Sequence, residues 1–352
     1  MKIIRTEPFK NRIGLWDFYK GLLMIYVVVA HAWSNWIPFE EAVLFNRTSA
    51  AAMGCFFILS GYSFKKSSPG ECLKKQARQY LPPYILMAVC SIAIVLVKNL
   101  LMRRNPMPKT VACVLGFGLA VSRGGFYGGR ELGGCGTGWF LLALFLSWNL
   151  LNLIFQMDRE WHRALAVVLL WSMGLLVRGL PQWIFCITQS LNALVFLYTG
   201  YLLKKEKFFQ SKIPGPLFAL LGVCAGIALV FGMADFSNNI WSLGVFSLLG
   251  SLAAAILALK AYTCLVVPDS GLTELVMKIG RYSYWIMVIH GIDIAGVQIH
   301  LVMRRLELPI YLNRCLLLTE YILFICGGCA VAEVFTRLKA GGRLGRGWDT
   351  NK

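Results

Sequence analysis

The feature that most constrains this chain is a series of long apolar blocks with very few charged residues. Each block is about as long as a helix that crosses the hydrocarbon core of a bilayer, roughly 20 residues. Hydrophobic residues make up 57% of the sequence and charged residues 15%, whereas a soluble domain has about 25% charged residues. A single soluble core cannot bury so many apolar side chains. We therefore predict an all-α integral membrane protein.

The apolar blocks predict ten transmembrane helices within one polytopic membrane domain that covers residues 1–352. These ten blocks extend over residues 14–36, 43–64, 81–102, 139–156, 163–179, 184–203, 214–233, 240–262, 282–303 and 311–336. A shorter apolar segment, 109–122, lies inside an outer segment of about residues 103–138. We expect it to be re-entrant or interfacial, with an additional span as the alternative.

The net charge of +18 would suggest nucleic acid as a partner of a soluble protein. Here the basic residues gather in short segments beside apolar blocks, where they set orientation and contact anionic lipid. No basic stretch is interleaved with aromatic residues, so we expect a lipid bilayer and no nucleic acid as partner. Counting Lys and Arg on each side predicts that both termini are cytoplasmic, including a basic tail at 337–352.

One basic cluster does not fit this orientation rule. The predicted outer segment between Lys98 and Gly138 has a single acidic residue, Glu131, beside six basic ones: Lys98, Arg103, Arg104, Lys109, Arg123 and Arg130. Three explanations remain open: it folds back toward the cytoplasm, it attracts an anionic substrate, or it is a tolerated long loop. Its last part, Arg123–Gly138, is rich in glycine and is either a flexible flap over a substrate site or a plain linker.

The first predicted helix contains two ionisable residues, Lys20 and His31, within an apolar surrounding. They are 11 residues apart, so at about 100° per residue they share one helix face to within about 20° and are separated by about 16 Å along the axis. Ionisable groups at such depth usually pair, face a cavity or take part in chemistry. Histidine suits proton abstraction from a hydroxyl, and lysine suits phosphate binding. An interhelical hydrogen bond is the alternative for His31.

Two more ionisable residues, His290 and Asp293, are three positions apart in a late apolar block. On a helix this spacing places them on one face. They could orient a substrate, tune a proton path or cross-link helices, and all three roles remain open. The Cys326–Cys329 pair lies in a predicted span without polar partners, and we expect no metal site.

Several stretches resemble the acyltransferase-3 family, bacterial membrane-bound acyltransferases that modify surface glycans. The first is Asp17-Phe18-Tyr19-Lys20-Gly21 followed by Val27-Val28-Val29-Ala30-His31, which resembles the family's opening helix. The family usually has arginine at the basic position; lysine, with the aspartate and the lysine-glycine pair, is similar to the fucose 4-O-acetylase-like branch. Four further stretches match in order: Phe56-Phe57-Ile58-Leu59-Ser60-Gly61-Tyr62, Arg78-Gln79-Tyr80-Leu81-Pro82-Pro83-Tyr84, Trp139-Phe140-Leu141, and Gly280-Arg281-Tyr282-Ser283 leading to Ile289-His290.

The resemblance implies a multi-pass O-acyltransferase of the bacterial plasma membrane. Such an enzyme moves an acyl group, usually acetyl, from cytoplasmic acyl-coenzyme A to a hydroxyl of a surface glycan or its precursor. It implies three catalytic residues, with His31 as general base assisted by His290 and Asp293, and two residues that hold the coenzyme A phosphates, Lys20 and Arg78. The neighbouring lysines either help to hold these phosphates or only set topology: Lys65, Lys66, Lys74 and Lys75.

Two other functions remain open on the sequence. The chain could be a non-enzymatic exporter or transporter of a glycan or lipid, with His290, Asp293 and Glu320 as a proton relay. It could also act on a small molecule or amino acid with no sugar acceptor. For the acyltransferase, we expect direct transfer rather than a covalent intermediate on Ser60, because nothing in the sequence places a base beside that residue.

Overall fold

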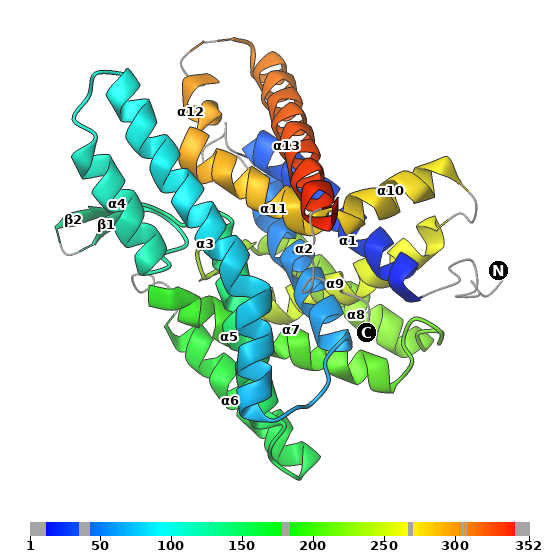
Figure 1. The fold of residues 1–352 in the computed structure, drawn as a ribbon. Coiled ribbons are helices and arrows are strands. Elements are labelled where there is room, and N and C mark those ends of the chain that lie inside the picture. Colours follow the sequence, from blue (N-terminus) through cyan, green and yellow to red (C-terminus); the bar gives the residue numbers. More distant parts are fainter. Residues whose placement is uncertain are drawn as a thin grey trace.

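The computed structural model describes residues 12–34, 43–127, 129–177, 184–266, 270–303, 306 and 308–341. This part of the chain is built of helices with two small antiparallel hairpins between them, which confirms the all-α prediction (Figure 1). The helices are α1 (Arg12–Ser34), α2 (Val43–Tyr62), α3 (Pro69–Leu101), α4 (Met107–Gly118), α5 (Gly138–Ile154), α6 (Glu160–Leu176), α7 (Ile187–Lys205), α8 (Gly215–Phe231), α9 (Val245–Leu265), α10 (Gly271–Arg281), α11 (Ser283–Ile292), α12 (Ile299–Met303) and α13 (Ile310–Gly341). The hairpins pair β1 (Gly125–Tyr127) with β2 (Arg130–Leu132) and β3 (Ala234–Asp235) with β4 (Ile240–Trp241), and two short turns of helix are η1 (Ile184–Cys186) and η2 (Asp293–Val297).

Six helices in the described residues are long and apolar enough to cross a membrane. They lie at Gly14–Ser34, Val43–Tyr62, Pro69–Leu101, Ile184–Lys205, Val245–Leu265 and Ile310–Val331. Three more apolar segments are shorter: Gly138–Ile154, Gly215–Phe231 and Ser283–Val297. A helix of about 17 residues is about 25 Å long, somewhat less than a typical hydrocarbon core. Ten spans and cytoplasmic termini therefore remain predictions.

Large apolar side chains cover much of the outside of these helices. On α8 they include Phe218, Leu220, Val223 and Phe231, all of them more than half exposed. A soluble monomer rarely exposes a continuous apolar surface of this kind. Together with the apolar helices, this surface identifies a multi-pass membrane protein whose outer faces contact lipid.

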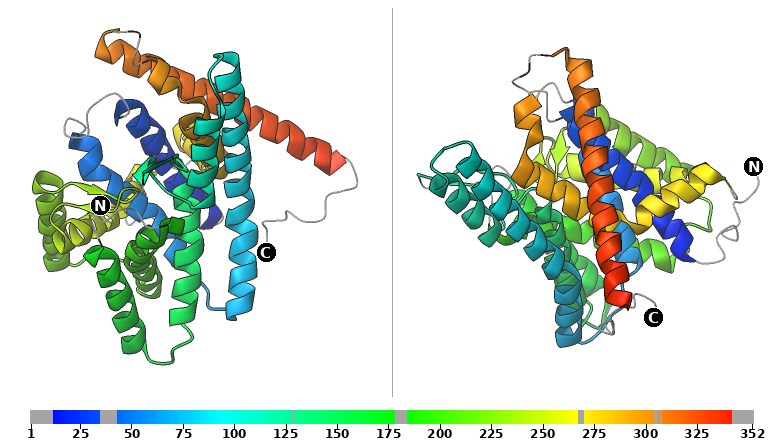
Figure 2. Two further views of the ribbon diagram at one scale, coloured as in Figure 1. Left: turned by 90° about the vertical axis from the view of Figure 1, so that its left-hand side faces the viewer. Right: turned by 45° about the horizontal axis from the view of Figure 1, so that its top comes forward.

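The helices α2, α5, α7 and α9 form the centre of the bundle, with α2 packed against α7 and α9 and α5 packed against α3 and α7. An aromatic cluster fills this centre: Phe57 lies 5.2 Å from both Phe140 and Phe236, measured between ring centroids. Figure 2 shows α13 on the outside of the bundle, where it packs along α11 and α1. The β3–β4 hairpin reaches into the centre, since Phe236, in its loop, is 2% exposed.

Helix α3 starts earlier than the predicted span at 81–102. Ser68 and Glu71 form a capping box, in which the Ser68 hydroxyl accepts a hydrogen bond from the Glu71 backbone N–H and the Glu71 carboxylate accepts one from the Ser68 N–H. Such a box stabilises a helix start. Arg78, expected in a connecting loop, therefore lies on this helix. The helix begins at Pro69, about three turns before the predicted span, and the bounds of the span itself remain a prediction.

The predicted continuous span at 282–303 was also wrong. Helix α11 ends at Ile292, the next five residues form a π-helical turn, and Gln298 adopts a left-handed conformation with φ of 58° before α12 begins. Lys98 of α3 binds this break: its ammonium donates hydrogen bonds to the backbone oxygens of Gly296 and Val297 and to the Gln298 side chain, at 2.9, 3.2 and 3.0 Å. These bonds satisfy carbonyls that a regular helix would pair internally.

The glycine-rich outer segment is folded against α4. Gly133 donates a backbone hydrogen bond to the oxygen of Ala112, and Cys135 donates one to that of Val121, each at 2.7 Å. Helix α4 has 12 residues and is about 18 Å long, too short to cross a bilayer. The extra span considered for 109–122 is therefore excluded. The hydrogen bonds also argue against an unstructured linker.

Helices α1 and α10 cross at backbone contact through two glycines. A Cβ atom on Gly21 would lie 2.0 Å from the backbone oxygen of Val276, and one on Gly280 would lie 1.7 Å from that of Asp17. Neither position has room for a side chain. The crossing fixes the start of α1 against the end of α10, and with it the residues next to the two glycines.

We predict that Gly280→Ala destabilises the protein because the added methyl group must push α10 away from α1. The expected loss is about 1–3 kcal/mol, the usual cost of overpacking. Thermal unfolding of the protein purified in detergent measures it. The matched control is Gly226→Ala on α8, where an added Cβ meets no atom within 4 Å and stability should be unchanged or slightly higher. Equal melting temperatures for the two variants would contradict the close crossing.

Candidate active site

A cavity of about 330 Å³ lies between α1, α2, α3, α5, α11 and the β3–β4 hairpin. We refer to it as the first cavity. Its middle is apolar, with Met24, Met53, Phe56 and Phe140 in its wall. Lys20, His31 and His290 also line it, so three of the five predicted site residues share one cavity. Pockets of this type, largely apolar with a few converging polar groups, are typical of small-molecule sites.

Lys20 and His31 occupy different levels of this cavity because they lie three turns apart on α1. Ser60, at the end of α2, also lines the cavity and is 15 residues beyond Phe45, about 22 Å along that helix. Neighbours of His31 are Phe45, at the start of α2, and Asp235 in the hairpin. The end of α1 therefore lies beside the start of α2, so the two helices are antiparallel, and the cavity extends along both.

The two histidines lie together at one level of the first cavity. The centroids of the His31 and His290 rings are 5.4 Å apart, and the His290 ring packs edge-on against Tyr321 of α13 at 4.6 Å. His290 is 1% exposed, and neither of its ring nitrogens has a hydrogen-bond partner among the described residues. A buried unpaired imidazole is costly. It is therefore available to a bound hydroxyl group.

Asp293 does not line the first cavity. It begins the π-helical turn η2, is 1% exposed, and neither carboxylate oxygen has a hydrogen-bond partner in the described part of the chain. The predicted Asp293–His290 contact at helical spacing is thus not a hydrogen bond. Ile292 and Asp293 both keep right-handed helical dihedral angles, so His290 and Asp293 are on one side of the helix but make no hydrogen bond with each other. Its catalytic role stays a prediction.

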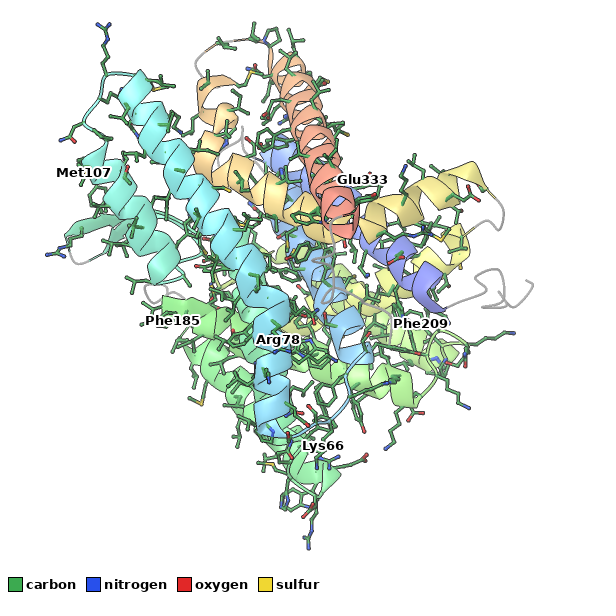
Figure 3. All side chains as sticks on the ribbon, viewed as in Figure 1. Lys66, Arg78, Met107, Phe185, Phe209 and Glu333 are labelled. Carbon is green, nitrogen blue, oxygen red and sulfur yellow. The ribbon has the colours of Figure 1, made fainter. Side chains whose placement is uncertain are left out.

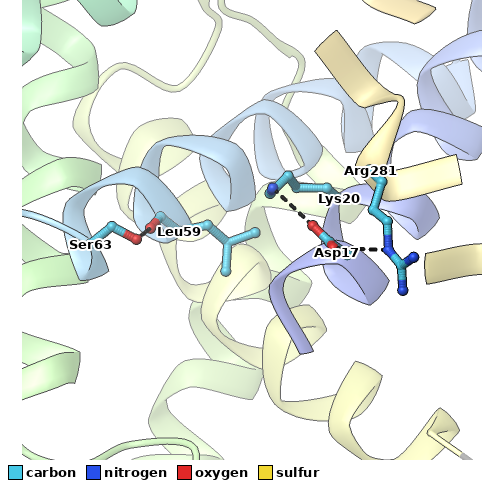
Figure 4. A network of polar contacts seen from close by, with 5 residues as sticks. All are labelled: Asp17, Lys20, Leu59, Ser63 and Arg281. Atoms are coloured by element: carbon cyan, nitrogen blue, oxygen red, sulfur yellow. Dashed lines mark hydrogen bonds and ion pairs between the residues drawn. The ribbon is translucent and has the colours of Figure 1, made fainter. Parts of the chain in front are cut away.

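A network of charges lies at the Lys20 end (Figure 4). Lys20 Nζ is 3.2 Å from Asp17 Oδ1, and Arg281 Nε is 3.5 Å from Asp17 Oδ2. The Lys20 and Arg281 side chains are 41% and 64% exposed, whereas that of Asp17 is 7% exposed. One carboxylate thus faces two cations, which leaves one net positive charge accessible there. The α1–α10 crossing produces this arrangement, because Lys20 directly precedes one glycine of the crossing, Gly21, and Arg281 directly follows the other, Gly280.

Arg78 is exposed on α3 and does not line the first cavity, although the next two residues, Gln79 and Tyr80, do. Figure 3 shows Arg78 on the lower part of α3, with Lys66 near the start of that helix and Met107 at the opposite end of the bundle. Arg78 is therefore next in sequence to residues of the cavity wall and is not part of that wall. Its phosphate-binding role remains a prediction.

Asp235 is a candidate site residue that the sequence analysis did not identify. It lines the first cavity together with His31 and is 8% exposed. Its carboxylate accepts hydrogen bonds from the Ser237 backbone and hydroxyl and from the Asn238 backbone and side chain, at 2.8, 2.6, 3.2 and 2.5 Å. Four donors hold the carboxylate in place. A buried aspartate in a short connection between two apolar helices was the available signal.

Arg281 was also missed as a site residue, although its motif was noted. The relevant signal was the Gly280–Arg281 pair, which matches the Lys20–Gly21 pair in mirror order. Nothing in the sequence states that α10 contacts α1. The pairing of two distant glycines is visible only in the fold.

A family model described as an acyltransferase domain, that of the acyltransferase-3 family, matches residues 14–337. The chain belongs to this family. This acyltransferase is therefore an enzyme that uses an acyl donor, and the non-enzymatic exporter considered above is set aside. No curated protein and no solved structure matches it. The match is to the family as a whole, so the fucose 4-O-acetylase-like branch remains a prediction.

Proposed function

We propose that this acyltransferase transfers an acetyl group from acetyl-coenzyme A to a hydroxyl of a bacterial surface glycan or of its precursor, in the plasma membrane. The observation that carries the proposal is that one cavity has a cationic end at Lys20 and a histidine pair, His31 and His290, at another level. A thioester donor with a charged nucleotide and a long neutral arm needs both features. The apolar wall between them suits the neutral arm.

The Lys20 end of the first cavity is the donor-phosphate site. Lys20 and Arg281 both have exposed charge and share a single carboxylate, Asp17. Phosphate oxygens accept charge-assisted hydrogen bonds from both types of cation, and arginine adds the bidentate geometry that lysine lacks. Arg281 thus compensates for the lysine at the position where the family usually has arginine. Arg78, which directly precedes Gln79 of the cavity wall, adds positive electrostatic potential for the phosphates.

The histidine pair is the chemical centre. His31 accepts the proton of the acceptor hydroxyl as that oxygen attacks the thioester carbonyl carbon. The new C–O ester bond forms, the C–S bond breaks, and the coenzyme A thiolate leaves and takes up a proton. His290, whose nitrogens are unpaired in the described chain, holds the hydroxyl beside His31. Asp293, at the start of the turn that follows the helix of His290, assists the two histidines.

The alternative covalent route through Ser60 has less support. Ser60 lines the first cavity near Lys20, whereas both histidines lie at the other level. A serine nucleophile needs a base within hydrogen-bond reach. Direct transfer from donor to acceptor requires only the groups at the histidine level. With both termini cytoplasmic, the donor enters from the cytoplasm at Lys20.

We predict that His31→Gln abolishes acylation because it removes the base while keeping a similar side-chain size. General-base catalysis contributes about 10²–10⁴-fold to a rate, so product should fall at least 100-fold. Mass spectrometry of surface glycans from cells with the native gene, with no gene and with His31→Gln measures the acetyl increment.

The matched control for this comparison is His162→Gln on α6, a histidine that does not line the first cavity. It should retain the acetyl increment. Membrane-inserted protein is quantified for both variants through an affinity tag, so that a loss of protein is not mistaken for a loss of activity. An undiminished increment in the His31→Gln strain would refute the proposed role of His31.

A second prediction concerns the donor phosphates. Lys20→Gln and Arg281→Gln should each raise KM for acetyl-coenzyme A about tenfold, because each removes a charge-assisted hydrogen bond. Acetyl-pantetheine has no phosphate, so its KM should be the same for wild type and both variants. Steady-state kinetics in detergent measures both constants.

The control for this pair is Lys212→Gln, an exposed lysine outside the first cavity, which should leave both KM values unchanged. If the variants raised KM for acetyl-pantetheine as much as for acetyl-coenzyme A, the phosphate assignment would be wrong. A change in kcat alone would point to a disturbed α1–α10 crossing instead.

A further inference from the structure

A second cavity, of about 830 Å³, lies between α3, α4, the glycine-rich segment and the broken helix η2–α12. Its wall contains four basic side chains and one acidic side chain: Lys98, Arg104, Lys109, Arg123 and Glu131. These are four of the six basic residues that the orientation rule did not explain. The fold brings them around one space although they lie on two helices and two separate loops. A tolerated loop would not require this convergence.

The described wall of this second cavity is positively charged, since its Lys and Arg side chains outnumber its acidic ones by four to one. Lys109 forms an ion pair at 2.5 Å with Glu131. Glu131 is the only acidic side chain in the described wall. Lys98 is bound by backbone carbonyls and an amide oxygen, which satisfy its protons without cancelling its charge. Three net positive charges therefore face the cavity. Low-dielectric walls around charges of one sign focus the field and attract ions of the opposite sign.

The second cavity adjoins the histidine level of the first one. Gly136 lines the second cavity and Thr137 lines the first. Ser122 of the second cavity donates a hydrogen bond to the backbone oxygen of Ser237, which lines the first. Lys98 also binds η2, which directly follows the helix that carries His290. The proposed donor-phosphate residue, Lys20, lines the first cavity, so the positive charge of the second cavity is separate from the donor site.

We propose that the second cavity binds an oxyanion of the acceptor glycan, a carboxylate or a phosphate ester, while the hydroxyl to be acylated lies beside His31 and His290. This inference rests on the proposed function. Arg104 and Arg123 are the main ligands, since arginine binds both types of oxyanion through paired hydrogen bonds. The acceptor is thus an acidic sugar or a phosphate-bearing one rather than a neutral sugar.

The test compares two double variants with equal loss of charge. Arg104→Gln with Arg123→Gln removes two charges from the wall of the second cavity. Arg103→Gln with Arg130→Gln removes two charges from the same outer segment, but neither residue lines the cavity. The purified full-length enzyme acylates glycan extracted from cells without the gene, and KM is measured separately for glycan and for acetyl-coenzyme A.

We expect the cavity variant to raise KM for the glycan at least tenfold, with KM for acetyl-coenzyme A within about twofold of wild type. The control variant should change neither constant. Glucuronic acid and glucose 6-phosphate compete for the carboxylate and phosphate forms of the site, and glucose is the neutral comparison. At least one of the two anionic sugars should inhibit the wild type more strongly than glucose, and should lose this advantage in the cavity variant.

Three results would overturn the inference. The first is equal glycan KM values for the cavity and control variants. The second is inhibition by glucose equal to that by both anionic sugars. The third is a defect of the cavity variant that appears only in phosphatidylglycerol vesicles and not in phosphatidylcholine vesicles, which would assign the cavity to a lipid headgroup. A wild-type enzyme that transfers no acetyl group would remove the proposed function itself, so the two failures are distinguishable.

Discussion

The backbone contact between α1 and α10 is the constraint on which the rest of the site depends. Because Gly21 and Gly280 leave no side chain between the helices, Asp17 comes close enough to pair with both Lys20 and Arg281. The same contact fixes the rotation of α1 about its axis. Lys20 faces the first cavity only in that rotation, and His31, three turns further on, then faces it as well. One crossing therefore positions both Lys20, the proposed donor-phosphate residue, and His31, the proposed base.

The second organising feature is the break in the helix that follows His290. A continuous helix would pair its own carbonyls and would present the residues after Ile292 to its neighbours in regular order. Here Lys98 donates hydrogen bonds to the freed carbonyls of Gly296 and Val297, which would be costly to leave unpaired inside the protein. The break therefore joins α3 to the end of α11. It also opens the space that becomes the second cavity, next to the buried His290.

Part of this site follows from the sequence and part of it depends on the fold. The shared face of Lys20 and His31 follows from helix geometry alone, and the excess of basic residues between Lys98 and Arg130 was visible as a departure from the orientation rule. The π-helical turn was not predictable, because hydropathy is continuous through residues 292–297 and does not distinguish one helix type from another. Arg281 and Asp235 were missed for a different reason. Asp235 reaches the first cavity, and Arg281 reaches Asp17, only through contacts with segments distant in the sequence.

In the proposed function, the two cavities bind the anionic groups of the two substrates separately. A donor with phosphates and an acidic acceptor both require cations, yet two anions bound side by side would repel each other. Placing Lys20 and Arg281 at one level and the arginines of the second cavity beyond the other keeps the anionic groups apart. Only the neutral ends of the two substrates, a thioester and a hydroxyl, then need to meet. In the proposed reaction they meet beside His31 and His290, where the wall is largely apolar and an unpaired imidazole interacts strongly with a hydroxyl proton. The separation of charge at the ends is thus what leaves the middle of the cavity suitable for acyl transfer.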